Sequence, residues 1–321
     1  MRARILIWIV LACATADAQP LIYNRLPSFG LTPEARIDGV VAYDPFSRQI
    51  FLFGGDSGFP RNDLWAFSLD FRSWTPIAAS PAPAQRFGHT VVFDSLRRRL
   101  IVFGGQAAGF FNDVWAYDIA AGSWRLLASD TGPEKRYGHS GIYDPVRDRM
   151  IISHGFTTRG RFDDTWSFDL AANVWRNITP AGPLPVRRCL HHAVHDPDND
   201  QMLLYGGCAS GVGTQEGGGC PLGDLWAFDL NTNRWRELKP SNKPPARQWY
   251  GLAFDAARRR MVVFGGFWAG SLSDTWEYDP AANTWLPADL AGTQPMPRSR
   301  HEGGSQRSSL FRRKNRRGVV E

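Results

Sequence analysis

One pattern of about 50 residues occurs five times in this chain of 321 residues, and it constrains the fold more than any other feature. Each copy begins with an arginine, continues with an apolar run that ends in an acidic residue, and then has a second apolar run that ends in a glycine pair. The five arginines are Arg36, Arg86, Arg136, Arg188 and Arg247. A repeat of this length indicates a radial or solenoid architecture, in which each unit buries its apolar faces against its neighbours.

Glycines and tryptophans occupy fixed places in every copy. The glycine pairs are Gly54-Gly55, Gly104-Gly105, Gly206-Gly207 and Gly265-Gly266, with His154-Gly155 in the third copy. A first tryptophan follows an aspartate by two positions, at Trp65, Trp115, Trp166, Trp226 and Trp276. A second tryptophan comes nine residues later, at Trp74, Trp124, Trp175, Trp235 and Trp285. Glycine permits positive φ and close backbone approach, so the pairs are expected where inner strands crowd, and in the third copy only Gly155 is expected to be required.

Hydrophobic spacing within a copy predicts four β-strands. The runs HTVVFD and RLIVFGG are rich in β-branched and aromatic residues around a polar turn, which predicts a hairpin. The first tryptophan and the aromatic residue two positions later share one face of a third strand, and the second tryptophan opens a fourth. A small sheet that is apolar on both faces is stable only between neighbours, and closing the stack into a ring gives a β-propeller.

The paired glycines, the following aromatic residue and the tryptophans at fixed distance resemble the kelch repeat family over about residues 36 to 290. Kelch repeats fold as propeller blades, usually six or seven to a ring. The resemblance implies an all-β, kelch-type β-propeller with five complete four-stranded blades and an incomplete sixth. The family includes binding modules, scaffolds and a few enzymes, so the fold alone does not determine the function.

Residues 1–18 are predicted to be a secretory signal, because a basic start and an apolar core precede the small-x-small site Ala16-Asp17-Ala18. A lipoprotein lipidated at Cys13 is the alternative. The apolar core is too short to span a bilayer, so we expect an exported periplasmic or extracellular protein without a transmembrane segment. The following segment LIYNRL, at residues 21–26, is predicted to be an orphan fourth strand that completes the last blade and closes the ring.

A sixth copy is predicted to begin at Arg300 and then to stop. From Arg298 to Glu321 there are eight Lys and Arg against two acidic residues, and the resulting +6 equals the net charge of the whole chain. The charges before Arg298 therefore sum to zero, and we expect a propeller over residues 19–300 and a basic, disordered tail over residues 301–321. A truncation, a frame shift or a divergent tail are all compatible with this pattern. The tail is not expected to bind nucleic acid, although basic clusters can do so.

Three cysteines follow the predicted signal, at Cys189, Cys208 and Cys220. Cys208 and Cys220 flank the long insertion CASGVGTQEGGGC after the fourth glycine pair. We predict a disulfide between them, because closing a long flexible loop stabilises the fold in the chain-entropy description. Cys189 is then left over, either as a buried thiol or as an alternative partner.

If the strands run up and down, the loops after the glycine pairs and the loops that lead into the arginines emerge on one face. Variable loops of repeat proteins often form the binding face. The candidate ligand-binding residues on this face are Arg36, Arg86, Arg136, Arg188, Arg247, Phe59, Phe110, Phe111, Arg159, Arg161, Phe267 and Trp268. Arginine suits carboxylates, sugar acids or acidic peptides, because its planar group donates two parallel hydrogen bonds.

The five repeat arginines also have a structural interpretation. Each repeat has one such arginine and one aspartate before its first tryptophan, and equal numbers at fixed spacing predict ion pairs within or between blades. The non-repeating aromatic and basic residues are then the better ligand candidates. Their alternative role is to cover the end of the central channel or the neighbouring blade.

No metal site, cofactor or catalytic residue is predicted. His89, His139 and His191 hold the same place in three repeats, which indicates an architectural role. Cys189, His191, His192 and His195 are spread along too much of one strand for the convergent ligands that zinc or copper needs. Galactose-oxidase-type copper enzymes also use a kelch-like propeller, but the tyrosine and histidine residues of their site cannot be mapped here.

The sequence therefore favours a monomeric, exported, non-enzymatic binding or scaffold module. Its partner is expected to be a protein or carbohydrate ligand on the loop-bearing face. The alternative is a carbohydrate-active propeller enzyme that resembles sialic acid mutarotases or galactose oxidase.

Overall fold

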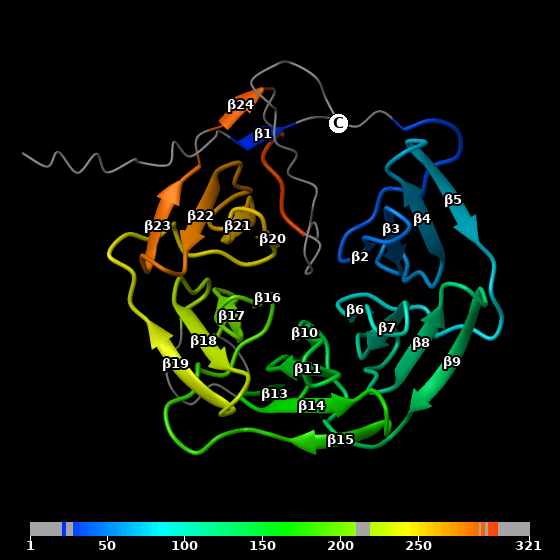
Figure 1. Cartoon of the computed structure of the whole chain (residues 1–321), viewed down its shortest axis with the longest axis horizontal. Coiled ribbons are helices and arrows are strands. Elements are labelled where there is room, and N and C mark those ends of the chain that lie inside the picture. The colour runs from blue at the N-terminus through cyan, green and yellow to red at the C-terminus, as the bar shows by residue number, and fades with distance from the viewer. Residues whose placement is uncertain (1–20, 24–27, 210–218, 289, 293–294, 301–321) are drawn as a thin grey trace, which may run out of the picture.

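The computed structural model of the protein describes residues 21–23, 28–209, 219–288, 290–292 and 295–300. Every regular element in this part of the chain is a β-strand. The predicted signal, residues 1–18, and the predicted tail, residues 301–321, lie outside the described residues. Five four-stranded antiparallel sheets surround a common axis as the blades of a propeller, which confirms the predicted kelch-type fold (Figure 1).

The blades follow one another along the chain, and each contains its strands in sequence order. Blade one consists of β2 (Val40–Asp44), β3 (Gln49–Phe53), β4 (Leu64–Ser68) and β5 (Ser73–Ile77). Blade two consists of β6 (Thr90–Asp94), β7 (Arg99–Phe103), β8 (Val114–Asp118) and β9 (Ser123–Ala128). Blade three consists of β10 (Ser140–Asp144), β11 (Arg149–Ser153), β14 (Thr165–Asp169) and β15 (Val174–Asn177).

Blade four consists of β16 (His192–Asp196), β17 (Gln201–Tyr205), β18 (Leu225–Asp229) and β19 (Arg234–Leu238). Blade five consists of β20 (Gly251–Asp255), β21 (Arg260–Phe264), β22 (Thr275–Asp279) and β23 (Thr284–Pro287). The first strand of each blade lies nearest the axis and the fourth lies at the rim (Figure 1).

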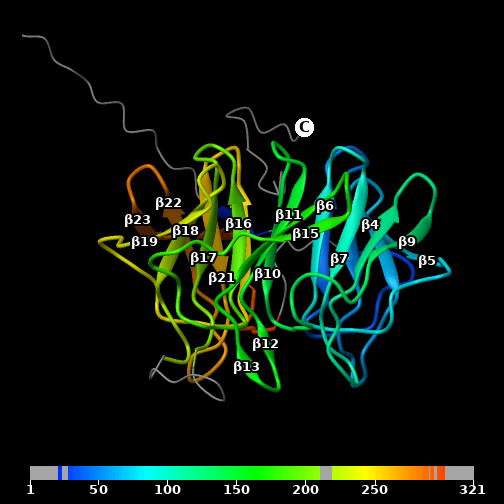
Figure 2. The same cartoon turned by 90° about the horizontal axis from the view of Figure 1, so that it is seen from below.

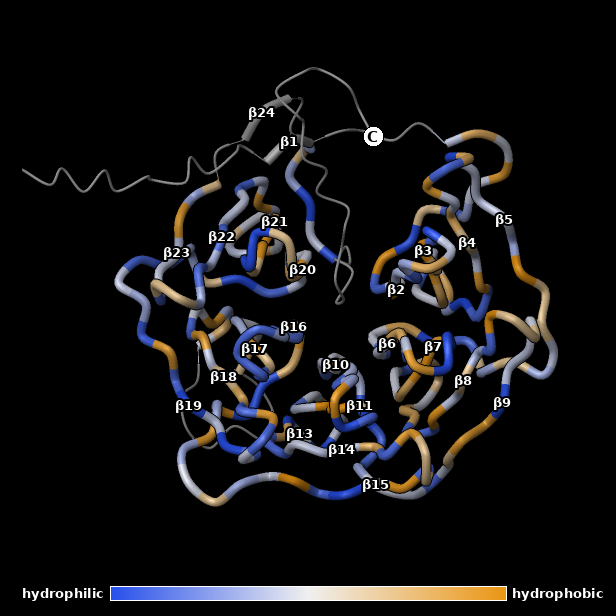
Figure 3. The backbone as a smooth tube through the Cα atoms, in the orientation of Figure 1, coloured by the Kyte–Doolittle hydropathy of each residue, from blue (hydrophilic) through white to orange (hydrophobic). Residues whose placement is uncertain are grey.

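The hydrophobic core is divided among the interfaces between neighbouring blades. Each of four buried clusters combines residues of two consecutive blades, and hydrophobic segments recur in every blade (Figure 3). At the interface of blades one and two, the rings of Phe53 and Trp124 lie 5.1 Å apart. Trp124 also packs 5.1 Å from Tyr117 on the third strand of its own blade. The second tryptophan of a repeat therefore joins its blade to the preceding one.

The third blade departs from this arrangement and compensates for it. Ser153 stands where the other repeats have Phe or Tyr, and His154 stands at the first glycine position with a φ of +62°. The His154 ring lies 5.9 Å from Trp235, edge to face, in the place that the missing aromatic ring leaves. A polar residue can adopt this left-handed conformation, whereas the φ of +108° at Gly155 strongly favours glycine.

Backbone hydrogen bonds link six residues in turn around the axis. Each N–H group donates to the carbonyl of the equivalent residue in the preceding repeat, at 2.9 to 3.4 Å. The five bonds run from Gly138 to Gly88, from Leu190 to Gly138, from Trp249 to Leu190, from Arg300 to Trp249 and from Asp38 to Arg300. All six residues have φ between +51° and +64°. We call them the axial ring. Arg300 is bonded to blade five and to blade one, so the chain after blade five connects the two ends of the row of blades.

The sixth copy begins at Arg298, and the predicted start at Arg300 was wrong. The Arg298 carbonyl accepts a hydrogen bond from Gly266 N–H at 2.9 Å, as the Arg86 carbonyl does from Gly55 N–H. Arg300 instead holds the axial-ring position. The sequence spacing agrees with Arg298: the repeat arginine of the next copy follows the second tryptophan by 12 or 13 residues in the other copies, and Arg298 follows Trp285 by 13 whereas Arg300 follows it by 15.

The first strand also differs from the prediction. β1 (Leu21–Tyr23) pairs in parallel with β24 (Leu290–Gly292), which follows blade five. Among the described residues β1 is therefore not the fourth strand of a blade, although it does join the start of the chain to the segment after the last blade. Sequence spacing places a strand along the chain but does not specify its partner or its direction.

The loops after the glycine positions and the loops before the inner strands meet on one face, as predicted. Antiparallel bridges join Ile37 to Asp56, Phe87 to Gln106, Tyr137 to Phe156, Cys189 to Cys208 and Gln248 to Phe267. We call this side of the propeller the loop face. The hairpin of β12 (Phe156–Thr157) and β13 (Gly160–Arg161) projects from it (Figure 2).

Candidate functional site

The five repeat arginines form ion pairs inside their own blades. Each guanidinium donates to both oxygens of the aspartate that precedes the first tryptophan. The pairs are Arg36–Asp63, Arg86–Asp113, Arg136–Asp164, Arg188–Asp224 and Arg247–Asp274. Each Nη1 also donates to the carbonyl at the first glycine position, at 2.8 to 3.0 Å. The first tryptophan donates through Nε1 to the same carboxylate at 2.7 to 2.8 Å. We call this arrangement the repeat clamp.

The clamp arginines are buried, so their guanidinium groups stabilise the fold and are not available to a ligand. The side chains of Arg86, Arg136, Arg188 and Arg247 are fully buried, and that of Arg36 is 5% exposed. They therefore correspond to the structural interpretation and are not part of the ligand-facing surface proposed below.

The clamp also controls the ionisation of its aspartates. Burial opposes their ionisation, but the hydrogen bonds and charge of the paired arginine outweigh it. The result is a lowered pKa for the carboxyls of Asp63, Asp164, Asp224 and Asp274.

Four of the non-repeating candidates contact other protein groups. Phe111 packs against the buried Arg86 guanidinium, with 4.3 Å from Cζ to the ring centroid. The Phe110 ring lies 6.3 Å from that of Phe156. Arg159 pairs with Glu134 although its side chain is 77% exposed, and Arg161 lies 5.5 Å over the Phe156 ring. These contacts favour the covering role for Phe110 and Phe111.

The other three candidates are exposed aromatic residues, and the Arg61 guanidinium lies 4.0 Å over the ring of one of them, Phe59. Phe59, Phe267 and Trp268 retain 54%, 36% and 53% of their accessible surface. Phe59 comes from the β3–β4 loop of blade one, and Phe267 and Trp268 come from the β21–β22 loop of blade five. Ile37 of blade one is also exposed on this face. The exposed apolar candidates therefore belong to blades one and five, the two blades that Arg300 joins in the axial ring.

A polar and aromatic group lies at the axis between these loops. It consists of Asp38, Tyr137, Trp249 and Arg300, and we call it the axial cluster. The Arg300 guanidinium lies 4.2 Å over the Trp249 ring, and the Trp249 ring lies 6.0 Å from that of Phe267. Burial raises the pKa of Asp38 to about 6, although the charge of Arg300 opposes this rise. Burial also raises the pKa of Tyr137, and the nearby charge of Asp38 adds to the effect.

The sequence contained a signal for the axial cluster that the prediction missed. The third residue of the copy is glycine at Gly88 and Gly138. A side chain at Gly88 has no room, because its Cβ would lie 2.1 Å from the Tyr137 ring. In the other copies the third residue is not glycine, and its side chain therefore lies at the axis. These residues are Asp38, Leu190, Trp249 and Arg300.

The repeated histidines are architectural. His89, His139, His154 and His191 are buried, and their rings pack edge to face against Phe53, Phe103, Trp235 and one another. Burial lowers the pKa of all four, and to about 3 for His139 and His154. Within the described residues, no group of three or more His, Cys, Asp or Glu side chains is placed to hold a metal.

The structure contains the predicted disulfide between Cys208 and Cys220, with Cα atoms 4.4 Å apart. Cys189 is a buried free thiol. In the described part of the chain, no helix is long and apolar enough to cross a membrane.

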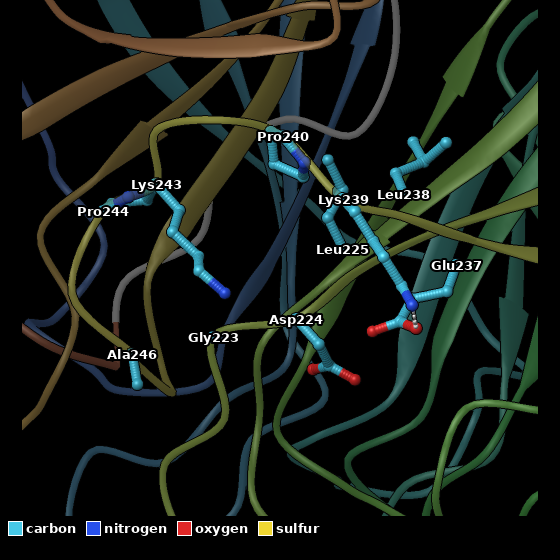
Figure 4. Close-up of a pocket in the computed structure, with 10 residues that line it drawn as sticks. All are labelled: Gly223, Asp224, Leu225, Glu237, Leu238, Lys239, Pro240, Lys243, Pro244 and Ala246. Carbon is cyan, nitrogen blue, oxygen red and sulfur yellow. Dashed lines mark ion pairs between the residues drawn. The ribbon is translucent and has the colours of Figure 1, made fainter.

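A surface pocket at the outer part of blade four does not coincide with the candidate residues. It is lined by Gly223, Asp224, Leu225, Glu237, Leu238, Lys239, Pro240, Lys243, Pro244 and Ala246 (Figure 4). Asp224 is already held in a repeat clamp, and Lys239 pairs with Glu237 at 3.4 Å. We therefore place the candidate site at the axial cluster and the exposed loops.

Comparisons with known proteins agree with this fold. Residues 27–276 match the Attractin/LZTR1 β-propeller. The host cell factor homolog hcf-1 of Caenorhabditis elegans is 34% identical over 82 residues, which cover 24% of this chain and 9% of that protein. Acyl-CoA-binding domain-containing protein 5 of Arabidopsis thaliana is 29% identical over 139 residues, 43% of this chain and 20% of that protein. Kelch domain-containing protein 2 of Bos taurus is 27% identical over 117 residues, 35% of this chain and 27% of that protein.

The similarity is limited to the propeller, because the matched segments span at most 27% of the length of these relatives. The family match covers most of the repeats and agrees with five four-stranded blades around one axis. This chain belongs to the Attractin/LZTR1 β-propeller family and is a kelch-type propeller.

Proposed function

We propose that this propeller is a non-enzymatic binding module whose ligand contacts the loop face at the axial cluster and the exposed loops of blades one and five. One observation supports this proposal most strongly. The repeat arginines are used inside the blades, whereas Phe59, Phe267 and Trp268 are exposed on loops of the loop face, and the Phe267 ring lies 6.0 Å from that of Trp249 in the axial cluster. Exposed aromatic residues next to charged groups are typical of binding surfaces.

A protein segment is the first candidate ligand, because kelch-type propellers typically bind proteins. A carbohydrate is the second, and the exposed indole of Trp268 supports it, since aromatic faces stack on sugar rings.

The experiment screens the full-length protein against a displayed peptide library and a glycan array. We expect ligands whose affinity falls at least tenfold in Trp268→Ala and in Asp38→Asn. The matched control is Phe46→Ala, because Phe46 is 63% exposed in the β2–β3 turn at the opposite end of blade one. Equal losses in Phe46→Ala, or unchanged binding in both loop-face variants, contradict the proposal.

We further propose that the module acts outside the cytoplasm. The disulfide supports this location, because such bonds persist mainly in oxidising compartments. If residues 1–18 direct export, mass spectrometry of the exported protein should find Gln19 at its amino terminus. A cytosolic protein that retains Met1 contradicts this location.

A further inference from the structure

The three cysteines of the fourth repeat lie together on the loop face. Cys189 and Cys208 are directly opposite one another in an isolated antiparallel bridge. Cys189 N–H donates to the Cys208 carbonyl at 3.0 Å, and Cys208 N–H donates to the Cys189 carbonyl at 2.8 Å. Cys208 is at the same time bonded through sulfur to Cys220.

This backbone geometry suits a second pairing of Cys208. Residues that exchange both hydrogen bonds across antiparallel chains have Cα atoms about 5.5 Å apart. Disulfides are most common at Cα separations of about 5.5–6 Å. The other repeats show the same bridge at Phe87–Gln106 and Tyr137–Phe156, so the fold itself fixes the distance between positions 189 and 208.

Arg161 supplies a positive charge to the same place. Its Nη2 lies 3.6 Å from Cys208 Sγ, and its charge favours the thiolate of Cys189. Its buried Nε and Nη1 have no hydrogen-bond partner. A buried guanidinium with unused donors stabilises an anion that forms beside it, because unpaired buried charge is costly.

We propose that Cys189, Cys208 and Cys220 form a thiol–disulfide exchange site in which Cys208 alternates between two partners. Cys189 loses its proton to solvent, and its Sγ attacks Cys208 Sγ. The Cys189–Cys208 bond forms while the Cys208–Cys220 bond breaks. The electron pair leaves on Cys220 Sγ, which then takes up a proton. One disulfide and one thiol are present before and after, so no oxidant or reductant is consumed.

The exchange changes which thiol is accessible. Cys189 is buried, whereas Cys220 is exposed. The second state therefore presents a surface thiol on the loop face that can react with a small disulfide or an alkylating reagent. Burial raises the pKa of the Cys189 thiol, with Arg161 opposing the rise, so exchange should accelerate as the pH increases.

The test begins with Cys220→Ser in the full-length protein, oxidised in air and mapped by mass spectrometry without reduction. We expect a Cys189–Cys208 disulfide. In the matched control Cys208→Ser, Cys189 and Cys220 should both remain thiols. Peptide mapping assigns Cys13 separately. Free thiols at both Cys189 and Cys208 in Cys220→Ser overturn the proposal.

A second measurement uses the unaltered cysteines and does not depend on the folding of a cysteine variant. Iodoacetamide should alkylate Cys220 slowly at pH 7 and at least tenfold faster at pH 9. Arg161→Met should slow this reaction several-fold at fixed pH, and Arg161→Lys should restore part of the rate. The proposal fails if alkylation occurs only at Cys189 or if Arg161→Met has no effect.

Discussion

Single residues in this propeller are determined by neighbours in the next blade. Ser153 and His154 replace the usual aromatic–glycine pair, and together they present one ring to Trp235. Ser153 Oγ and His154 Nδ1 form a hydrogen bond, which fixes the imidazole in this orientation. The sequence predicted that Gly155 is required, but it could not predict the compensation, because Trp235 lies about 80 residues away along the chain.

A double-mutant cycle tests this compensation. His154→Gly should cost about 2–4 kcal/mol of unfolding free energy, because it leaves a cavity beside Trp235. Ser153→Phe alone should cost about 1–3 kcal/mol through overpacking. The double variant restores the common aromatic–glycine pair and should recover at least ~1 kcal/mol relative to the sum of the two. Additive effects in urea unfolding contradict the compensation.

At the scale of the strand and its loops, the repeat clamp holds the blade together. It joins the loop before the first strand, the turn after the second strand and the start of the third strand. The sequence predicted an arginine–aspartate pair from equal numbers and fixed spacing. It left open whether the arginines also reach a ligand, because spacing does not report burial.

Breaking one clamp should destabilise the protein strongly. Arg86→Met leaves the Asp113 carboxylate without its buried partner and should cost about 3–5 kcal/mol of unfolding free energy. Arg48→Met is the control, because the pair between Arg48 and Asp70 is exposed to solvent, and it should leave the unfolding free energy almost unchanged. Urea unfolding at neutral pH measures both. Similar losses in the two variants rule out the structural role assigned to the clamp.

For the whole molecule, the repeat was sufficient to predict the architecture but not the composition of the site. The period and the tryptophan positions identify strands, blades and a common face without further information. The axial cluster combines four residues from different repeats; a residue other than glycine at the third position marks Asp38, Trp249 and Arg300, but nothing in the pattern marks Tyr137. The parallel pairing of β1 with β24 depends on backbone hydrogen bonds, which the sequence does not display.

The four buried histidines should make the folded propeller sensitive to mild acid. Their pKa values in the folded state are below the ordinary value of 6.5, so the unfolded chain binds more protons as the pH falls. The stabilising contribution of His139 and His154 is complete above about pH 6.5 and is lost progressively toward pH 3, at about 1.4 kcal/mol per pH unit for each of the two, and His89 and His191 act in the same direction.

Urea unfolding between pH 7.5 and pH 5 measures this loss. His139→Gln should reduce the pH slope of the unfolding free energy by about 1.4 kcal/mol per pH unit below pH 6.5. His195→Gln is the comparison, because His195 is only half-buried. Identical slopes in both variants exclude His139 as a source of acid sensitivity.

The axial ring also bears on how such a molecule can change over evolutionary time. Each of its hydrogen bonds joins only adjacent repeats, through the same pair of backbone groups and the same left-handed conformation. A duplicated or deleted repeat therefore inserts or removes one link without altering the others. The number of repeats then sets the circumference of the propeller. Gene duplication can change this number one repeat at a time, while the hydrogen bond between adjacent repeats stays the same.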